Sequence, residues 1–429
     1  MTPHLFPDRL RLLVNRLRER LWAKPLAMGL LSAWAAISAT FADDTDLAQY
    51  LPRIAVDSLE SLLTIQASTM MVIATFAVAS MVSAYASVST SVTPRAFTLV
   101  VADDVSQNAL STFVGAFIFS IVALVATQNG FFGRAGLFTL FVLTLLVFSV
   151  VILTFVRWVD RIARLGRMGT TIGAVERATA AAMNRRKRAP HLQGAPVQLQ
   201  QVQGRPVYAD SVGFVQYIDV PALQACAEKA QGRVVVSALP GKFAAPGVVL
   251  AYISAPPGAT HDFDPAQVAA AFMIGDQRRY DDDPRFGLVV LAQIAGRALS
   301  PAVNDPGTAI DVVGTLVRLL VLWATPVDRQ DKTRPVNDRV EVPALATRDL
   351  LDDAFTAIAR DGAASIEIGI RLQKAMHALS STGDAALCEA ASHHAALALE
   401  RAESALTLPH DLDTLRGVAA SNPPALRAP

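Results

Sequence analysis

The sequence predicts a membrane α-helical domain of four transmembrane helices, followed by a cytoplasmic α+β region with a small β-rich module and an α-helical domain. Three observations indicate this fold class. Hydrophobic residues make up 52% of the 429 residues and charged residues only 17%, against roughly 25% in ordinary soluble proteins. Four apolar stretches without Asp, Glu, Lys or Arg lie in the first 160 residues. From about residue 204 onward, short strand-like segments and then amphipathic helical periods replace them.

The four apolar stretches are 25–42, 61–88, 109–127 and 136–156. Each comes near or exceeds the ~20 apolar residues that a helix needs to cross a bilayer core, and the first is the shortest. They predict a four-helix transmembrane domain at 25–157. None of these spans holds an ionisable side chain, which proton-coupled and voltage-gated mechanisms normally need. Both mechanisms are therefore disfavoured.

Basic residues concentrate on both flanks of the transmembrane domain, whereas the loop between its first two spans is acidic, with Asp43, Asp44, Asp46, Asp57 and Glu60. The positive-inside rule therefore predicts that both termini are cytoplasmic, in a multi-pass protein of the bacterial inner (plasma) membrane. Residues 1–24 carry leucines on one helical face and arginines on the other. They predict a basic amphipathic cytoplasmic helix that lies along the anionic inner leaflet.

The rest of the chain divides into four further segments. Residues 158–203 predict a basic helical stalk and linker, and a solvated linker with stop-transfer charges fits equally well. Residues 204–258 predict the small β-rich module, because runs of β-branched residues alternate there with turns such as "PGKFAAPG" (240–247). Residues 259–410 predict the α-helical cytoplasmic domain, and residues 411–429 a disordered tail.

Helical periodicity defines the elements of the α-helical domain. Asp311 and Arg318 interrupt the very apolar run at 306–324, which we therefore interpret as a buried core helix. The proline-broken, charged segment 325–343 predicts an exposed loop. The other helices are expected near 264–275, 284–299, 347–380 and 384–406.

The stretch "RALSPAVNDPGTAID" (297–311) places polar residues between two long apolar runs. Asp305 and Pro306 form a good helix start, since Asp accepts a backbone N–H as N-cap and proline suits the first helical position. A turn between helices accounts for part of the stretch, but a small ion or anion could also bind at this helix N-terminus. The stretch is thus either a structural polar network or a ligand site, with these candidate residues: Arg297, Ser300, Asn304, Asp305, Thr308 and Asp311.

The second span carries a row of hydroxyl side chains. At 100° per residue they project within about half of the helix circumference, with larger apolar residues on the other side. Such a face packs closely against a neighbouring helix or lines a water-filled pore, and Ile65, Val72 and Phe76 intrude on it. Both interpretations stay open for the candidate residues Ser61, Thr64, Ser68, Thr75, Ser80, Ser83 and Ser87.

Signatures of catalysis and of metal binding are missing from the sequence. It contains no nucleophile elbow, zincin motif, Walker A loop or dinucleotide fingerprint. We therefore expect no enzymatic activity, no catalytic residues, no cofactor and no bound metal. The run Asp281 to Asp283 is interpreted as an acidic cap ahead of Pro284, since calcium loops space their ligands alternately. The net charge of +1 gives no field that would draw the chain to nucleic acid.

Several stretches match the pattern of a known family: "TPRAF" (93–97), "GFVQYID" (213–219), "PGKFAAPG" and above all "GDQRRYDDDPRFGLVVLAQIAGRALSPAVNDPGTA" (275–309). Through them the chain resembles the bacterial predicted membrane proteins catalogued as domain of unknown function 2254, from the first span to about residue 325. The resemblance implies membrane location and a shared architecture, and no activity. It also implies that Arg297, Asn304, Asp305 and Thr308 belong to the family's own signature. The second span departs from the pattern in being richer in Ala and Ser.

These observations favour an integral inner-membrane protein that acts as a homo-oligomeric channel or pore, with the second span near the axis and the cytoplasmic part as a gating and assembly domain. Four helices are few for a path through one copy, so we expect the lipid bilayer and further copies of the chain as partners. The alternative is a membrane-anchored sensor or scaffold whose cytoplasmic domain binds a small anion or a protein partner around Arg297 and Asp305. A membrane enzyme with Asp305 or Asp311 as base is the weakest hypothesis, since nothing supplies a nucleophile or metal at a defined spacing.

Overall fold

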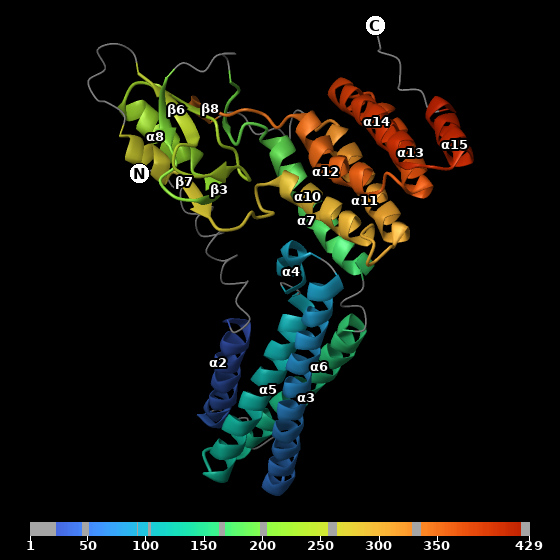
Figure 1. Ribbon diagram of the computed structural model, residues 1–429. Helices are drawn as coiled ribbons and strands as arrows, with labels where there is room; N and C mark the ends of the chain where they lie inside the picture. Colours follow the sequence, from blue (N-terminus) through green and yellow to red (C-terminus); the bar gives the residue numbers. More distant parts are fainter. Residues whose placement is uncertain are drawn as a thin grey trace. The chain divides into compact units, whose positions relative to one another are not determined.

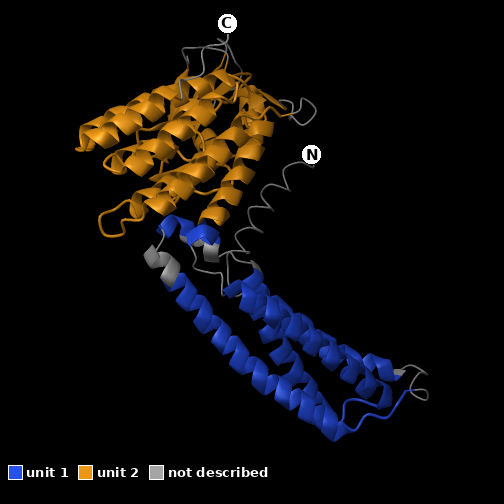
Figure 2. Cartoon of the chain, turned by 90° about the vertical axis from the view of Figure 1, so that its right-hand side faces the viewer, with its two compact units in different colours: residues 1–171 blue, residues 172–429 orange. Residues whose placement is uncertain are grey.

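A computed structural model of the chain describes residues 23–44, 51–91, 93–101, 104–162, 168–197, 204–255, 264–327 and 336–421. The chain forms two compact units, residues 1–171 and 172–429, which Figure 2 shows in different colours. The described part of unit 1 consists of helices, and unit 2 combines helices with two small β-sheets. Apart from Ala23 and Lys24, the amphipathic helix predicted at 1–24 lies outside the described residues.

Unit 1 is a bundle of long apolar helices, in which α5 packs against α2, α3 and α6 (Figure 1). The second, third and fourth predicted spans fall in α3, α5 and α6, and the first covers α2 and η1. Each of these four helical stretches is long and apolar enough to cross a membrane. Large buried side chains such as Leu63, Phe113 and Trp158 fill the space between them. The elements of unit 1 are α2 (Ala23–Ser38), the short 3₁₀ helix η1 (Ala39–Asp44), α3 (Val56–Ser91), α4 (Pro94–Val101), α5 (Asp104–Gln128) and α6 (Arg134–Ile162).

Asp43, one of the predicted acidic loop residues, fixes the start of α6. Its carboxylate accepts hydrogen bonds from the backbone N–H groups of Gly133 (2.7 Å) and Gly136 (2.8 Å). The first N–H groups of a helix have no partner within the helix, so this carboxylate satisfies donors that the helix itself leaves without an acceptor. The glycines make room for it, since a Cβ on Gly133 would lie 2.6 Å from Asp43 Oδ1.

The β-rich part of unit 2 contains a five-stranded sheet in the order β1-β8-β4-β6-β2 and a three-stranded sheet in the order β5-β3-β7. In the larger sheet, β8 is parallel to both β1 and β4, and β6 is antiparallel to β2 and β4. Helix α8 packs against β4 and β8, and Leu223, Val234, Leu250 and Val340 are fully buried between them. The elements are β1 (Gly194–Ala195), β2 (Arg205–Tyr208), β3 (Gly213–Ile218), α8 (Val220–Lys229), β4 (Arg233–Val236), β5 (Phe243–Ala244), β6 (Val249–Ser254), α9 (Pro265–Ala270), β7 (Phe272–Gly275) and β8 (Asn337–Glu341).

The helical part of unit 2 is built around α10 and α11. Helix α12 packs against α10, α13 packs against α11, and α14 lies between α12 and α13 in contact with both. Helix α11 also satisfies the length and composition of a membrane span. Its apolar side chains, Val312, Leu316 and Leu320 among them, are nevertheless buried within unit 2, in agreement with a core helix. The helices are α7 (Met168–Arg188), α10 (Pro284–Ala298), α11 (Pro306–Ala324), α12 (Thr347–Asp361), α13 (Ile366–Ser380), α14 (Ala385–Ala405) and α15 (Pro409–Ser421).

The structure corrects the sequence-based elements in two places within the β-rich part. Part of the segment expected as an exposed loop, 325–343, is strand β8, because Val340 and Val342 are fully buried against the sheet. The helix expected at 264–275 is the short α9 followed by β7, whose Phe272 to Gly275 pair with β3. The β-rich module therefore draws strands from well outside its predicted bounds of 204–258.

Three further corrections concern helices of unit 2. The single helix expected at 347–380 is split at Gly362 to Ser365, where Ser365 caps α13. The disordered tail expected from residue 411 is helix α15 as far as Ser421, because Leu415 is buried against Gly369 of α13. The predicted stalk, 158–203, contains α7, which from Ile172 onward is part of unit 2.

Candidate functional site

The hydroxyl row of the second predicted span lies on the uncovered face of α3. Leu59, Leu63, Met70 and Met81 are buried on the opposite face, where α3 packs against α5. No helix in the described part of the chain covers the hydroxyl face. Ser80 is half-buried, the side chain of Ser87 lies outside the described residues, and the exposed candidates are Ser61, Thr64, Ser68, Thr75 and Ser83.

Two of the exposed candidate hydroxyls bond back to their own helix. Ser68 Oγ donates to the carbonyl oxygen of Thr64 at 2.8 Å, and Thr75 Oγ1 donates to that of Met71 at 2.9 Å. Each of these two hydroxyls thus uses its hydrogen locally and presents oxygen lone pairs outward. The surface they form accepts hydrogen bonds and has no formal charge.

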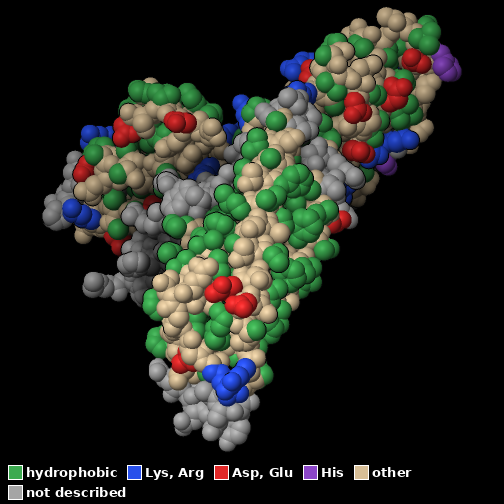
Figure 3. Space-filling model, turned by 90° about the horizontal axis from the view of Figure 1, so that it is seen from below, with side chains coloured by type: hydrophobic (Ala, Val, Ile, Leu, Met, Phe, Trp, Pro, Cys, Tyr) green, Lys and Arg blue, Asp and Glu red, His purple; other side chains and the backbone are tan. Residues whose placement is uncertain are grey.

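The uncovered face of α6 is different in kind. Large aliphatic side chains follow one another along it, and Leu146, Leu153 and Val156 are 56%, 63% and 62% exposed. Hydrophobic side chains spread over the surface of the bundle in this way (Figure 3). A face of this composition is suited to lipid. The face of α3 alternates hydroxyls with apolar residues, since Ile65, Val72 and Phe76 are also exposed there.

The structure places the polar stretch 297–311 in the turn between α10 and α11. Asp305 caps α11 as predicted, accepting from the backbone N–H of Thr308 at 3.0 Å and from its hydroxyl at 2.6 Å. These hydrogen bonds, the hydroxyl first, lower the pKa of Asp305. Ser300 Oγ donates to the carbonyl oxygen of Arg297 at 2.7 Å and closes the end of α10. Asn304 has a φ of 49°, a left-handed conformation that Asn tolerates better than most residues.

The six candidates of this stretch do not converge on one cavity. Arg297, Asn304, Asp305 and Asp311 are exposed, and Ser300 and Thr308 are half-buried. Asp311 lies six residues beyond the cap. The hydrogen bond and charge of Glu176 raise the pKa of Arg318, and the charge of Asp311 adds to this effect. The local hydrogen bonds thus account for Ser300, Asp305 and Thr308 as parts of a turn between helices.

The acidic run ahead of α10 forms a buried junction. Asp283, 3% exposed, caps α10 at the N–H of Phe286 (3.1 Å) and accepts from Arg278 Nε and Nη2 at 2.7 and 2.9 Å. Burial raises the pKa of Asp283, against the opposing effect of the Arg278 hydrogen bond. Gly241, with a φ of 92°, leaves the space that this carboxylate fills. The acidic cap predicted ahead of Pro284 is present, with Asp283 as the capping residue. The sequence pattern did not predict that Asp283 also pairs with Arg278.

The basic cluster at the end of α7 enters the same junction. Arg185 donates to the carbonyl oxygen of Asp281, Arg186 Nη2 to that of Pro343 at 3.2 Å, and Lys187 to that of Leu322. Burial lowers the pKa of Arg186 to about 10, with Asp282 and Asp283 acting in the opposite direction. The sequence does not predict these three hydrogen bonds, because their acceptors are backbone carbonyl oxygens, which every residue has.

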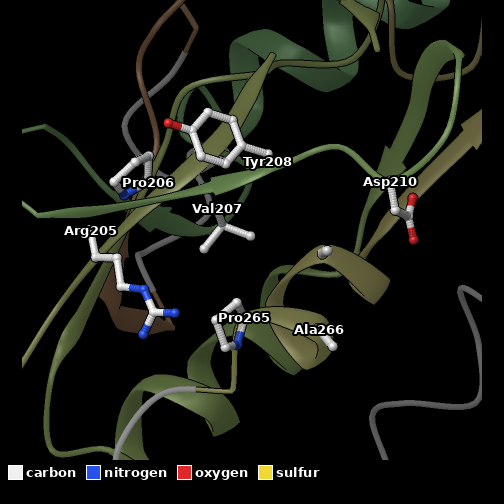
Figure 4. Close-up of a pocket in the computed structure, with 8 residues that line it drawn as sticks. Arg205, Pro206, Val207, Tyr208, Asp210, Pro265 and Ala266 are labelled. Atoms are coloured by element: carbon white, nitrogen blue, oxygen red, sulfur yellow. The ribbon is translucent and has the colours of Figure 1, made fainter. Parts of the chain in front are cut away.

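A shallow hollow of about 480 Å³ lies between β2 and α9. Arg205 extends toward Pro265 while Tyr208 points away from α9, so the polar groups at its rim do not face one another (Figure 4). Within the described ranges, no three His, Cys, Asp or Glu side chains are grouped so that they could hold a metal ion. The hollow therefore does not have the convergent polar groups of a catalytic pocket.

Comparisons with known proteins agree with the membrane helices. A family model described as "Predicted membrane protein (DUF2254)" matches residues 18–378. An uncharacterized protein of Mycobacterium bovis and one of Mycobacterium tuberculosis are each 32% identical to the chain over 149 residues. These matches cover 33% of the chain and 29% of each relative, so most of each relative's length lies outside them. No solved structure matches the chain.

Proposed function

The chain belongs to the DUF2254 family of predicted membrane proteins, and we propose that it acts as a homo-oligomeric channel or pore. It is a multi-pass membrane protein, and in this proposal α3 lines or borders the axis of the oligomer. Unit 2 is the cytoplasmic assembly and gating domain. The observation that carries the proposal is the outward hydroxyl face of α3, which no helix of the described chain covers.

The composition of the two uncovered faces supports this arrangement. A helix that meets only lipid needs no hydroxyls, and α6 presents large aliphatic side chains. The hydroxyl oxygens of α3 would hydrogen-bond water or a neighbouring copy, and the absence of charged side chains in the spans suits a passive or ligand-regulated path. One copy supplies a single such face, so several copies are needed to surround a path.

Cysteine modification in planar bilayers tests the proposal on the full chain. In a background with Cys226 and Cys388 replaced by Ala, Ser68→Cys and Leu153→Cys place thiols on the uncovered faces of α3 and α6. We expect a conductance from the unmodified protein, and a charged, water-soluble thiol reagent should change it in the Ser68→Cys variant only. Leu153→Cys is the matched control, because its thiol is expected to face lipid.

Two results would contradict the proposal that the protein is a channel. One is the absence of any conductance at all voltages and membrane tensions. The other is an equal response of both cysteine variants, which would mean that the hydroxyl face has no special access to water.

A further inference from the structure

Two arginine side chains of unit 2 converge on one glycine of α11. Helices α11 and α13 pack side by side (Figure 1). A Cβ placed on Gly314 of α11 would lie 3.0 Å from Nη2 of Arg371 on α13 and 3.9 Å from Nη1 of Arg318. Both guanidinium groups therefore reach the same spot on the surface of α11. Glycine is what allows Arg371 to come so close to the helix backbone.

The two arginines differ in what neutralises them. Arg318 Nε and Nη2 donate to the two carboxylate oxygens of Glu176 on α7, at 2.7 and 2.9 Å. Arg318 Nη2 also donates to Thr315 Oγ1 at 3.0 Å. The charge of Asp311 acts on Arg318 as well. Arg318 is thus already paired with acidic groups.

Arg371 has no hydrogen-bond or ion-pair partner within the described ranges, and its Nε is buried without an acceptor. Glu367, four residues earlier on α13, is not its partner; its carboxylate accepts from Ser365 Oγ at 2.9 Å. A buried Nε–H that lacks an acceptor is costly, because it loses its hydrogen bond to water without replacement. Two positive groups directed at one spot add mutual repulsion.

We propose that Arg371 and Arg318, on either side of Gly314, form a binding site for a small phosphate-bearing anion. A tetrahedral oxyanion at this spot would accept from the fork of Arg371 and remain within reach of Arg318. The site is separate from the hydroxyl face of α3 and from the turn at 297–311. Through the Arg318–Glu176 pair, an anion bound there would also act on α7.

Thermal unfolding of the full chain in neutral detergent tests the site, with inorganic phosphate compared with chloride at equal ionic strength. We expect phosphate to raise the melting temperature in a saturable way, because a ligand that binds the folded state stabilises it. Arg371→Gln should weaken the apparent phosphate affinity by about tenfold or more, as expected for losing charge-assisted hydrogen bonds. Lys374→Gln is the matched control, since it removes the same charge from an exposed position of α13 and should leave the shift unchanged.

A second variant and a second ligand sharpen the result. Gly314→Ala fills the shared spot and should also weaken phosphate binding while both arginines remain. Micelles doped with phosphatidylglycerol distinguish the source of the phosphate group: a shift with this lipid alone would assign the site to a lipid headgroup, and a shift with inorganic phosphate would assign it to a soluble ligand. Phosphate and lipid both without effect on the wild-type chain would overturn the proposal, as would equal shifts in wild type and Arg371→Gln.

Discussion

At the scale of single residues, His394 is the buried titratable group of unit 2 with the clearest consequence. It is 3% exposed, and its Nε2 lies 2.9 Å from Asp352 Oδ1. Burial lowers the pKa of His394 below 6.5, and the hydrogen bond to Asp352 opposes this effect. His393 and Arg401 lower the pKa further through their charges. The folded state therefore favours the neutral imidazole.

This shift predicts a pH dependence of stability. Because the pKa of His394 is lower in the folded than in the unfolded chain, the unfolded chain binds the proton more readily, and stability rises with pH in that window. The contribution of His394 should be complete above its unfolded pKa of about 6.5 and should decline as the pH falls below that value. Melting temperatures measured from pH 7.5 to 5.5 should fall more steeply in wild type than in His394→Gln. The exposed His410→Gln on α15 serves as control, and an unchanged slope in His394→Gln would contradict the prediction.

At the scale of elements, caps and apolar periods were predictable because their signals are local. Asp305 and Asp283 cap α11 and α10 as expected, and the four apolar stretches lie in helices. Strand β8 was not predictable in this way. Its residues "NDRVE" carry three charges, and what makes them a strand is pairing with β4, about 100 residues earlier. The proximity of Arg371 to Gly314 was likewise not predictable from the sequence, because it results from the packing of α13 against α11.

The contact of α7 with α10 yields a prediction at this scale. A Cβ on Gly287 would overlap Thr179, whose side chain is buried where the two helices meet. Gly287→Ala should therefore destabilise the protein by about 1–3 kcal/mol, the usual penalty of overpacking. Gly417→Ala is the control, because it meets no atom within 4 Å in α15 and improves helix propensity. Denaturant midpoints measure both. A neutral Gly287→Ala would show that α7 shifts freely against α10.

At the scale of the whole molecule, composition predicted a bundle of four apolar helices and a separate α+β part, and both are present. The boundaries of the segments within the α+β part could not be predicted as well. Strands β1 and β8, which belong to the five-stranded sheet, come from chain segments before and after the predicted β-rich module, and α7 comes from the predicted stalk. The hydroxyl face of α3 could be predicted as a stripe, but its exposure could not, because it depends on which face α5 covers.

The sidedness of the two units gives the last prediction. By the positive-inside rule, the acidic loop before α3 and the basic flanks of unit 1 predict that unit 2 is cytoplasmic. Val303 is 49% exposed between α10 and α11, and Phe131 is 65% exposed between α5 and α6. The predicted topology puts them on opposite sides of the membrane. In cells with Cys226 and Cys388 replaced by Ala, a membrane-impermeant thiol reagent should label Phe131→Cys in intact spheroplasts and Val303→Cys only after lysis. The reverse pattern would invert the topology and remove unit 2 as a cytoplasmic gate, because a domain outside the cell cannot respond to cytoplasmic ligands.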